Sequence, residues 1–235
     1  VHRVGDPPPP RHLFRQVDTR GGDGASALLR DLRCLGDDQA GARALAVIGD
    51  HRLRRYPLRC PRTGHRRHGE AVARRLAHLL SFRRAKRIVL YLSVNGELDT
   101  KALISLARKQ GKSLYLPVLH PFLHGRLLFC RWDKGGRLVR NRFGIEEPVC
   151  SSSRLKHLRG LDFVIVPLVA FDTNRNRIGM GGGYYDRTFF YAKSFRQWRR
   201  PMLVGVAHQF QQVEHIDASA WDVPLDLIVT ESSDF

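Results

Sequence analysis

From residue 69 onward, hydrophobic positions follow two alternating patterns. Hydrophobic residues three or four positions apart, starting after Gly69, predict an amphipathic helix of about three turns. The same spacing predicts helices over residues 100–110 and 183–193, and a shorter helix over 151–160. Continuous apolar runs predict strands at residues 87–92, 113–119, 126–132, 161–169, 202–208 and 225–229. After the third strand, a Gly-Gly turn is expected to lead into residues 138–143, which pair back as a hairpin.

Strands that alternate with helices are typical of a mainly parallel sheet covered on both faces. The sequence therefore predicts a single three-layer α/β domain over residues 69–235. No internal repeat is visible.

Residues 1–68 follow neither pattern. They contain four consecutive prolines, Pro7 to Pro10, followed by scattered glycine and aspartate, and the first 69 residues contain no lysine and no glutamate. Lysine and glutamate usually cover the exposed surfaces of helices, so their absence is unusual for a folded domain. We expect a disordered N-terminal extension. Two readings stay open: a native flexible extension, or a segment that comes from a mis-assigned start.

Charge and composition narrow the possible function classes. The formal net charge is +18, but the basic residues are spread along the chain, and 33 of the 40 are arginine. A dense basic face, as in proteins that bind nucleic acid, is absent from the sequence, so nucleic acid is not an expected partner. No apolar run approaches the length of a membrane span, and no signal peptide opens the chain. The four cysteines are far apart, which argues against a disulfide framework or a cysteine zinc site and favours a reducing cytoplasm.

The segment with the most chemical information is FDTNRNRIGMGGGYYDR, residues 171–187, between the most hydrophobic strand and a predicted helix. Its glycines would let backbone N–H groups approach a ligand closely. Arg177 supplies a permanent cation for phosphate, and Asp186 is an oxygen ligand suited to magnesium. Because the segment matches neither the Walker pattern nor the dinucleotide fingerprint, two readings stay open. It is either a phosphate or nucleotide site, or a flexible glycine turn.

Four motifs give a resemblance to a known family. They are YLSVNGELDT, GKSLYLPVLHP, PLVAFDTNRNRIGMGGGYYDR and WDVPLD, at residues 91–100, 111–121, 167–187 and 221–226. In content and order they resemble 5-formyltetrahydrofolate cyclo-ligase, also called methenyltetrahydrofolate synthetase. The resemblance implies an ATP-dependent, magnesium-requiring closure of 5-formyltetrahydrofolate to 5,10-methenyltetrahydrofolate. It implies a phosphorylated formyl intermediate, with ADP and phosphate released. We expect a monomer, located in the cytoplasm.

The resemblance also implies roles for individual residues. Asp186 would hold Mg²⁺, with Asp222 as a weaker candidate, and Leu92 and Glu97 would contact the folate. The catalytic candidates are Arg177 and Tyr185. The ATP-phosphate loop would comprise Arg177, Ile178, Gly179, Met180, Gly181, Gly182, Gly183, Tyr184 and Tyr185.

Several of these residues also have a purely structural interpretation. Leu92 could belong to the core, Glu97 to a solvated turn, and Asp222 could cap the turn before Pro224. His120 and His208, at the ends of predicted strands, are expected to be structural or peripheral. Asp99 is expected to cap a helix.

One departure from the family pattern concerns the N-terminal side. Members normally begin with a short basic helix of the type K-x-x-L-R that reaches over ATP. In this chain Arg54, Arg55 and Arg59 lie near the expected distance, but Pro57 and Pro61 interrupt such a helix. The alternative function is therefore a nucleotide-binding protein of the same fold without turnover.

Overall fold

The computed structural model describes residues 65–94, 96–190 and 200–235, all within one compact unit. The expected extension lies mostly outside these residues, as do Asn95 and the C-terminal part of the helix predicted over 183–193. None of the described helices is long and apolar enough to cross a membrane.

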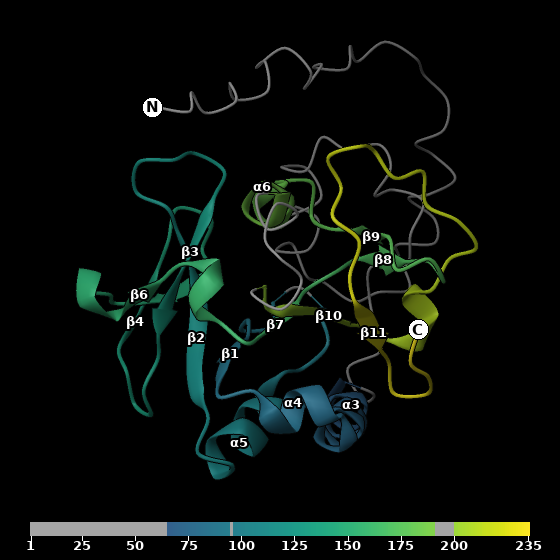
Figure 1. Ribbon diagram of the computed structural model, residues 1–235, viewed down its shortest axis with the longest axis horizontal. Helices are drawn as coiled ribbons and strands as arrows, with labels where there is room; N and C mark the ends of the chain where they lie inside the picture. The colour runs from purple at the N-terminus through teal and green to yellow at the C-terminus, as the bar shows by residue number, and fades with distance from the viewer. Residues whose placement is uncertain (1–64, 95, 191–199) are drawn as a thin grey trace, which may run out of the picture. The chain divides into compact units, whose positions relative to one another are not determined.

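A seven-stranded sheet with the order β11-β10-β7-β1-β2-β3-β6 forms the centre of this unit (Figure 1). The five strands from β11 to β2 are parallel to their neighbours, whereas β3 and β6 join antiparallel at one edge. This confirms the predicted mainly parallel sheet. The strands are β1 (Arg87–Val89), β2 (Ser113–Leu119), β3 (Leu127–Arg131), β6 (Leu155–Lys156), β7 (Phe163–Val166), β10 (Met202–Val206) and β11 (Leu227–Val229).

Helices lie on both sides of the sheet. One side carries α3 (His65–His78), α4 (Leu80–Arg84) and α5 (Lys101–Lys109), and the other carries α6 (Tyr184–Phe189) (Figure 1). Helix α3 begins four residues before Gly69, and it buries a stripe formed by Gly69, Val72, Ala73 and Leu76. The predicted helix over 151–160 is instead two 3-10 turns, Ser152–Arg154 and Leu158–Gly160, separated by β6.

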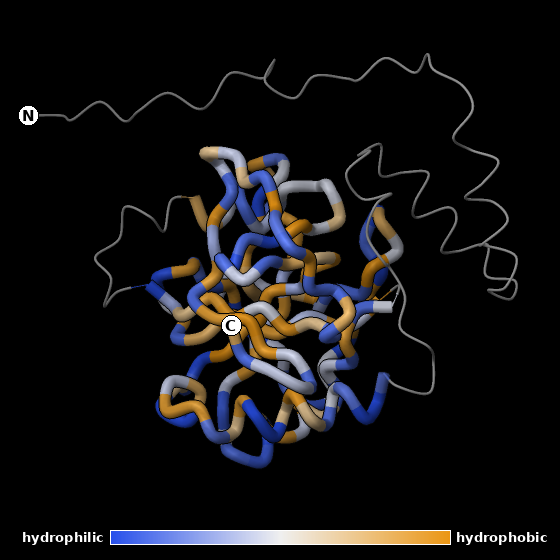
Figure 2. The backbone as a smooth tube through the Cα atoms, turned by 90° about the vertical axis from the view of Figure 1, so that its right-hand side faces the viewer, coloured by the Kyte–Doolittle hydropathy of each residue, from blue (hydrophilic) through white to orange (hydrophobic). Residues whose placement is uncertain are grey.

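Hydrophobic side chains form one main cluster on each face of the sheet, because the strand residues alternate in direction. On the α3 side, Phe82 meets Phe163 edge to face, with ring centroids 5.5 Å apart. On the α6 side, Phe171 and Phe189 are fully buried. Hydrophobic segments accordingly gather inside the fold, with hydrophilic ones on many of its turns (Figure 2). The three-layer arrangement follows from this two-sided burial.

Two expectations about the β3 edge were wrong. The segment after β3 does not pair back on it. Instead β4 (Leu138–Arg140) pairs with β5 (Glu146–Pro148) in a separate hairpin, and β6 takes the place beside β3. Cys130 and Cys150 form a disulfide with Cα atoms 6.0 Å apart, although a disulfide was not expected. The β4–β5 hairpin reverses the chain, so that Cys150 comes to lie beside Cys130 of β3. The spacing of the cysteines in the sequence does not reveal this. The argument from the cysteines for a reducing compartment therefore loses its basis.

A small hairpin separates β7 from the glycine loop. Strands β8 (Ala170–Phe171) and β9 (Arg177–Ile178) pair antiparallel, so the loop follows β9 rather than the long central strand. The turn between them is built around the buried Asp172, whose carboxylate accepts hydrogen bonds from Asn176 and from the backbone N–H of Ile216. This turn places Arg177 at the start of the loop.

Candidate active site

Arg177, at the start of the glycine loop, and Asp186, in the helix that follows it, form an ion pair. Nη2 of Arg177 donates to Oδ1 of Asp186 at 2.7 Å, and the arginine side chain is only 3% exposed. Nε of Arg177 is also buried, and no atom of the described residues forms a hydrogen bond with it. A buried cation with an unpaired N–H is suited to receive an anionic ligand oxygen.

The WDVPLD segment reaches Asp186 from the far side of the loop. The backbone N–H of Val223 lies 3.4 Å from Oδ1 of Asp186. Asp222 itself closes the preceding turn, since its Oδ2 accepts a hydrogen bond from the N–H of Ser219 at 2.8 Å. Residues that are 37 positions apart in the sequence are thus brought together at one carboxylate.

Tyr185 connects the loop with the NGELDT motif. Burial raises the pKa of Tyr185, and the negative charge of Glu97 raises it further, whereas Arg177 acts in the opposite direction. The Arg177 guanidinium carbon lies 6.0 Å from the centroid of the Tyr185 ring. Burial is also the main cause that raises the pKa of Tyr91, and Glu97 and Tyr185 contribute next. A carboxylate from one motif and a guanidinium from another therefore both act on the phenol of Tyr185 through their charges.

Glu97 is a strongly perturbed carboxyl group. Burial raises its pKa to about 7, and a hydrogen bond from the N–H of Val94 to Oε2, 3.0 Å long, opposes this shift. A carboxyl group whose pKa is shifted close to neutral pH is a common mark of a functional position. This environment separates Glu97 from an ordinary solvated turn residue.

Two glycines give the loop its shape. Gly181 and Gly183 have φ values of 81° and 59°, a conformation that favours glycine strongly. Gly183 directly precedes α6, which has only six residues, and Arg187 of that helix donates from Nε to the carbonyl of Gly125 at 3.0 Å. Of this loop, Gly181 and Gly182 are the residues exposed to solvent.

Tyr184 faces a region that the sequence analysis missed. Arg142, from the turn between β4 and β5, donates from Nη2 to the Tyr184 hydroxyl at 3.1 Å, and the neighbouring Phe143 meets its ring edge to face. A cavity of about 260 Å³ adjoins them, and its lining residues are Leu119, His120, Pro121, His124, Gly125, Arg126, Arg142 and Tyr184. Nothing in the hydrophobic pattern marks Arg142, because its place depends on how the hairpin packs.

The remaining candidates have mainly structural surroundings. Leu92 is half-buried and packs against the cluster on the α3 side. Nδ1 of His120 accepts hydrogen bonds from the N–H groups of Phe122 and Leu123. The N-cap residue of α5 is Thr100 rather than Asp99, and Asp99, directly before it, accepts a hydrogen bond from the N–H of Lys101. A second cavity, about 400 Å³, is lined by Arg66, Glu70, Asp99, Lys101 and Ala102, and none of the proposed catalytic, phosphate, folate or metal residues lines it.

Comparison with known proteins gives one consistent result. The model of the 5-formyltetrahydrofolate cyclo-ligase family matches residues 49–231, which begins upstream of the expected domain boundary at Gly69. The 5-formyltetrahydrofolate cyclo-ligase of Haemophilus influenzae is 44% identical over 163 residues, covering 68% of this chain and 84% of its own length. The Escherichia coli K12 protein of the same name is 42% identical over 166 residues, covering 70% and 88%.

A solved structure agrees with these sequence matches. The 5,10-methenyltetrahydrofolate synthetase of Aquifex aeolicus superimposes with a TM-score of 0.63 at 31% identity, covering 83% of this chain and 91% of that protein. The fold, the order of the motifs and the matched length all agree. The chain therefore belongs to the 5-formyltetrahydrofolate cyclo-ligase family.

Proposed function

We propose that this protein uses ATP to convert 5-formyltetrahydrofolate to 5,10-methenyltetrahydrofolate, with release of ADP and phosphate. The observation that supports this most strongly is the buried Arg177, which pairs with Asp186 through Nη2 and keeps an unpaired Nε at the glycine loop. Such a group suits a phosphate better than a neutral ligand, because a guanidinium donates two parallel hydrogen bonds to it.

In this proposal the loop from Arg177 to Tyr185 binds the ATP phosphates. The backbone N–H groups around Gly181 and Gly183 and the guanidinium of Arg177 stabilise the negative charge of the transferring phosphoryl group. An amide oxygen is a poor leaving group, so transfer of phosphate to the formyl oxygen would activate the formyl carbon. Attack by the neighbouring folate nitrogen would then close the ring as phosphate leaves.

Asp186 is the proposed ligand for Mg²⁺ that accompanies ATP. Its Oδ1 is occupied by Arg177 and Val223, which leaves Oδ2 as the oxygen for a cation. One carboxylate oxygen fits this ion, because Mg²⁺ is commonly held by one or two carboxylates together with substrate phosphates. Bound there, the ion would neutralise charge on the phosphates. Asp222 stays the weaker candidate, since its Oδ2 already accepts the N–H of Ser219.

Glu97 is the proposed contact for the folate, and Leu92 is a weaker one. An ionised Glu97 can accept hydrogen bonds from the amino and ring N–H groups that form the flat donor edge of the pterin. Tyr185, which interacts electrostatically with both Glu97 and Arg177, would then border both the folate and the phosphate sites.

The direct test is an absorbance assay for the methenyl product, with the full chain, 5-formyltetrahydrofolate, ATP and Mg²⁺. We expect product to form only when both ATP and Mg²⁺ are present, in step with ADP. ATP binding without any product, by a chain that is folded by circular dichroism, would instead favour the nucleotide-binding alternative. A version with a rebuilt basic N-terminal helix would then test whether the missing arm is the cause.

The perturbed Glu97 gives a second, pH-dependent prediction. Because the ionised carboxylate can accept from the pterin with both oxygens, whereas the protonated form turns one of them into an O–H donor, KM for the folate should fall as pH rises through about 7. In Glu97→Gln, KM should be raised by roughly tenfold to a hundredfold and should lose this pH dependence, as expected for loss of a hydrogen bond to a charged group. Glu146→Gln, at an exposed position in β5, is the matched control and should behave like the parent.

Glu97 should also make stability depend on pH. Whereas folate binding should improve as pH rises, the free energy of unfolding should decrease. The folded state holds the Glu97 proton up to a pKa of about 7, whereas the unfolded state releases it near the ordinary value of 4.5. The unfolding free energy should therefore decrease as pH rises from about 4.5 to 7, and this contribution should be absent in Glu97→Gln. Denaturant titrations across this range measure it. An identical slope in the parent and the variant would contradict the assigned environment of Glu97.

A further inference from the structure

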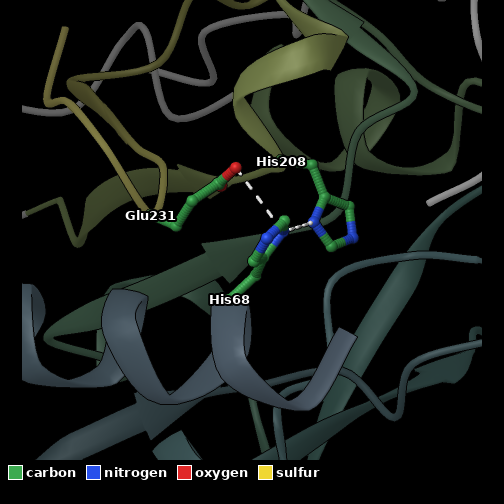
Figure 3. Close-up of side chains that lie close together, drawn as sticks. All are labelled: His68, His208 and Glu231. Carbon is green, nitrogen blue, oxygen red and sulfur yellow. Dashed lines mark hydrogen bonds and ion pairs between the residues drawn. The ribbon is translucent and has the colours of Figure 1, made fainter. Parts of the chain in front are cut away.

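A second group of polar side chains gathers away from the glycine loop. His68 from α3, His208 just after β10 and Glu231 just after β11 each present one ligand atom, and these atoms lie within 4.8 Å of one another (Figure 3). Strands β10 and β11 are parallel neighbours, so the residues that follow them meet at the same edge of the sheet. Helix α3 is joined to the end of the chain by an ion pair between Arg75 and Asp234, 2.9 Å long.

The distances within this group match those of ligands around one metal ion. The two Nδ1 atoms of His68 and His208 are 2.9 Å apart, and Nδ1 of His68 is 3.5 Å from Oε1 of Glu231. Nitrogen and oxygen ligands bound to Zn²⁺ at about 2.0–2.1 Å in a tetrahedral arrangement are separated by about 3.3 Å. Two imidazole lone pairs cannot face each other at 2.9 Å without a proton or a cation between them.

The ring of His208 is buried among other rings, and its Nδ1 faces Nδ1 of His68. The side chain is 0% exposed, one face stacks on Phe210 at a centroid distance of 5.2 Å, and the edge of His65 lies 5.2 Å from it. Within the described part of the chain, its Nε2 is buried without a hydrogen-bond partner.

A backbone N–H group fixes the position of the Glu231 carboxylate. Both of its carboxylate oxygens lie within 3.2 Å of the backbone N–H of Gln209, the residue directly after His208. Its side chain is 16% exposed and that of His68 is 29% exposed, so both are largely shielded from solvent. Outer contacts of this kind orient ligands before the ion arrives.

We propose that His68, His208 and Glu231 form a three-ligand site for a divalent transition-metal ion of the Zn²⁺ type, with the remaining coordination position open to water. Two imidazoles and one carboxylate suit Zn²⁺, whereas Mg²⁺ prefers an all-oxygen set. The site is therefore separate from the Mg²⁺ expected with ATP at Asp186, and it does not depend on the proposed function. A bound ion would cross-link α3 to the segments that follow β10 and β11.

The test is metal binding by the full chain after removal of metals with a chelator. Isothermal titration with Zn²⁺ and the visible absorption of Co²⁺ should both report a site of micromolar or tighter affinity. A hundredfold excess of Zn²⁺ over Kd should raise Tm by about 5 °C. Mg²⁺ at the same concentration should neither compete nor raise Tm.

Three variants decide whether these residues are the ligands. Glu231→Gln and His68→Gln keep the side-chain size and avoid the fully buried His208, so both should fold. Each should weaken Zn²⁺ binding at least tenfold, since loss of even an outer contact costs about that much. His215→Gln is the matched control, because His215 pairs with Asp217 at 3.2 Å on the exposed surface.

The outcomes separate clearly. Loss of Zn²⁺ binding and of the Tm increase in the first two variants, with His215→Gln unchanged, supports the site. Binding that is equal in all four proteins would overturn the proposal, because the ion would then sit on other residues. Absence of binding to the folded parent protein would also overturn it, and would leave a proton shared between His68 and His208.

Discussion

Replacement of Arg177 by lysine is expected to reduce kcat for the proposed cyclo-ligase reaction by about 10²–10³-fold, the usual effect of removing one donor to a developing negative charge. The guanidinium of Arg177 donates to Asp186 through Nη2 and has Nε left for a ligand. A lysine keeps the charge but has no fork, so one ammonium group cannot serve Asp186 and a phosphate with the same geometry. Steady-state rates at saturating ATP and folate measure the effect.

Arg175→Lys is the matched control for this prediction. Arg175 lies two residues away on the same turn, is exposed, and donates a side-chain hydrogen bond to the carbonyl of Asp226 at 3.3 Å. We expect its kcat to stay within about twofold of the parent. A Tm measurement on both variants checks that they fold. If Arg177→Lys kept more than a tenth of the parent activity, Arg177 would not be the main phosphate donor.

The largest expected effect on stability is that of Phe163→Ala, with a loss of about 3–5 kcal/mol in unfolding free energy. Phe163 is 0% exposed and lies on β7 between β1 and β10, with Ile88 and Met202 as its register partners. Its ring packs against Phe82, so truncation leaves a cavity in the middle of the α3-side cluster. The corresponding decrease in Tm is about 10 °C for a domain of this size.

Phe122→Ala is the same substitution at an exposed position and serves as its control. The side chain of Phe122 is 85% exposed, so its loss should change the unfolding free energy by less than about 0.5 kcal/mol. Denaturant melts of both variants give the comparison. A loss below 1 kcal/mol in Phe163→Ala would mean that the two-sided core around β7 is not packed as described.

Much of the fold could be predicted because hydrophobic periodicity reflects which side of an element is buried. The strand expected at residues 113–119 has those bounds, and the helices expected after Gly69 and Asp99 are present. The pairing partner of residues 138–143 and the Cys130–Cys150 bond were not predictable in the same way. Both depend on how a chain reversal packs, and no local pattern records that.

For the candidate site, the sequence alone supplied the residue types and their order. The glycines, Arg177, Asp186 and the motif with Glu97 were sufficient to indicate a phosphate-binding loop and a resemblance to one family. The sequence could not show that Arg177 is buried with an unpaired Nε, or that burial raises the pKa of Glu97 to about 7. Desolvation and charge interactions depend on neighbours in space, and these come from distant segments.

The cluster of His68, His208 and Glu231 is another feature that the sequence does not predict and the tertiary structure creates. The sequence placed His208 at a strand end, but it gave no reason to join it with a helix residue 140 positions earlier. The order of the helices and strands and the residue types of the glycine loop can be predicted from the local sequence. Which side chains meet, and whether water reaches them, is decided only when parallel strands bring their carboxyl ends to one edge of the sheet.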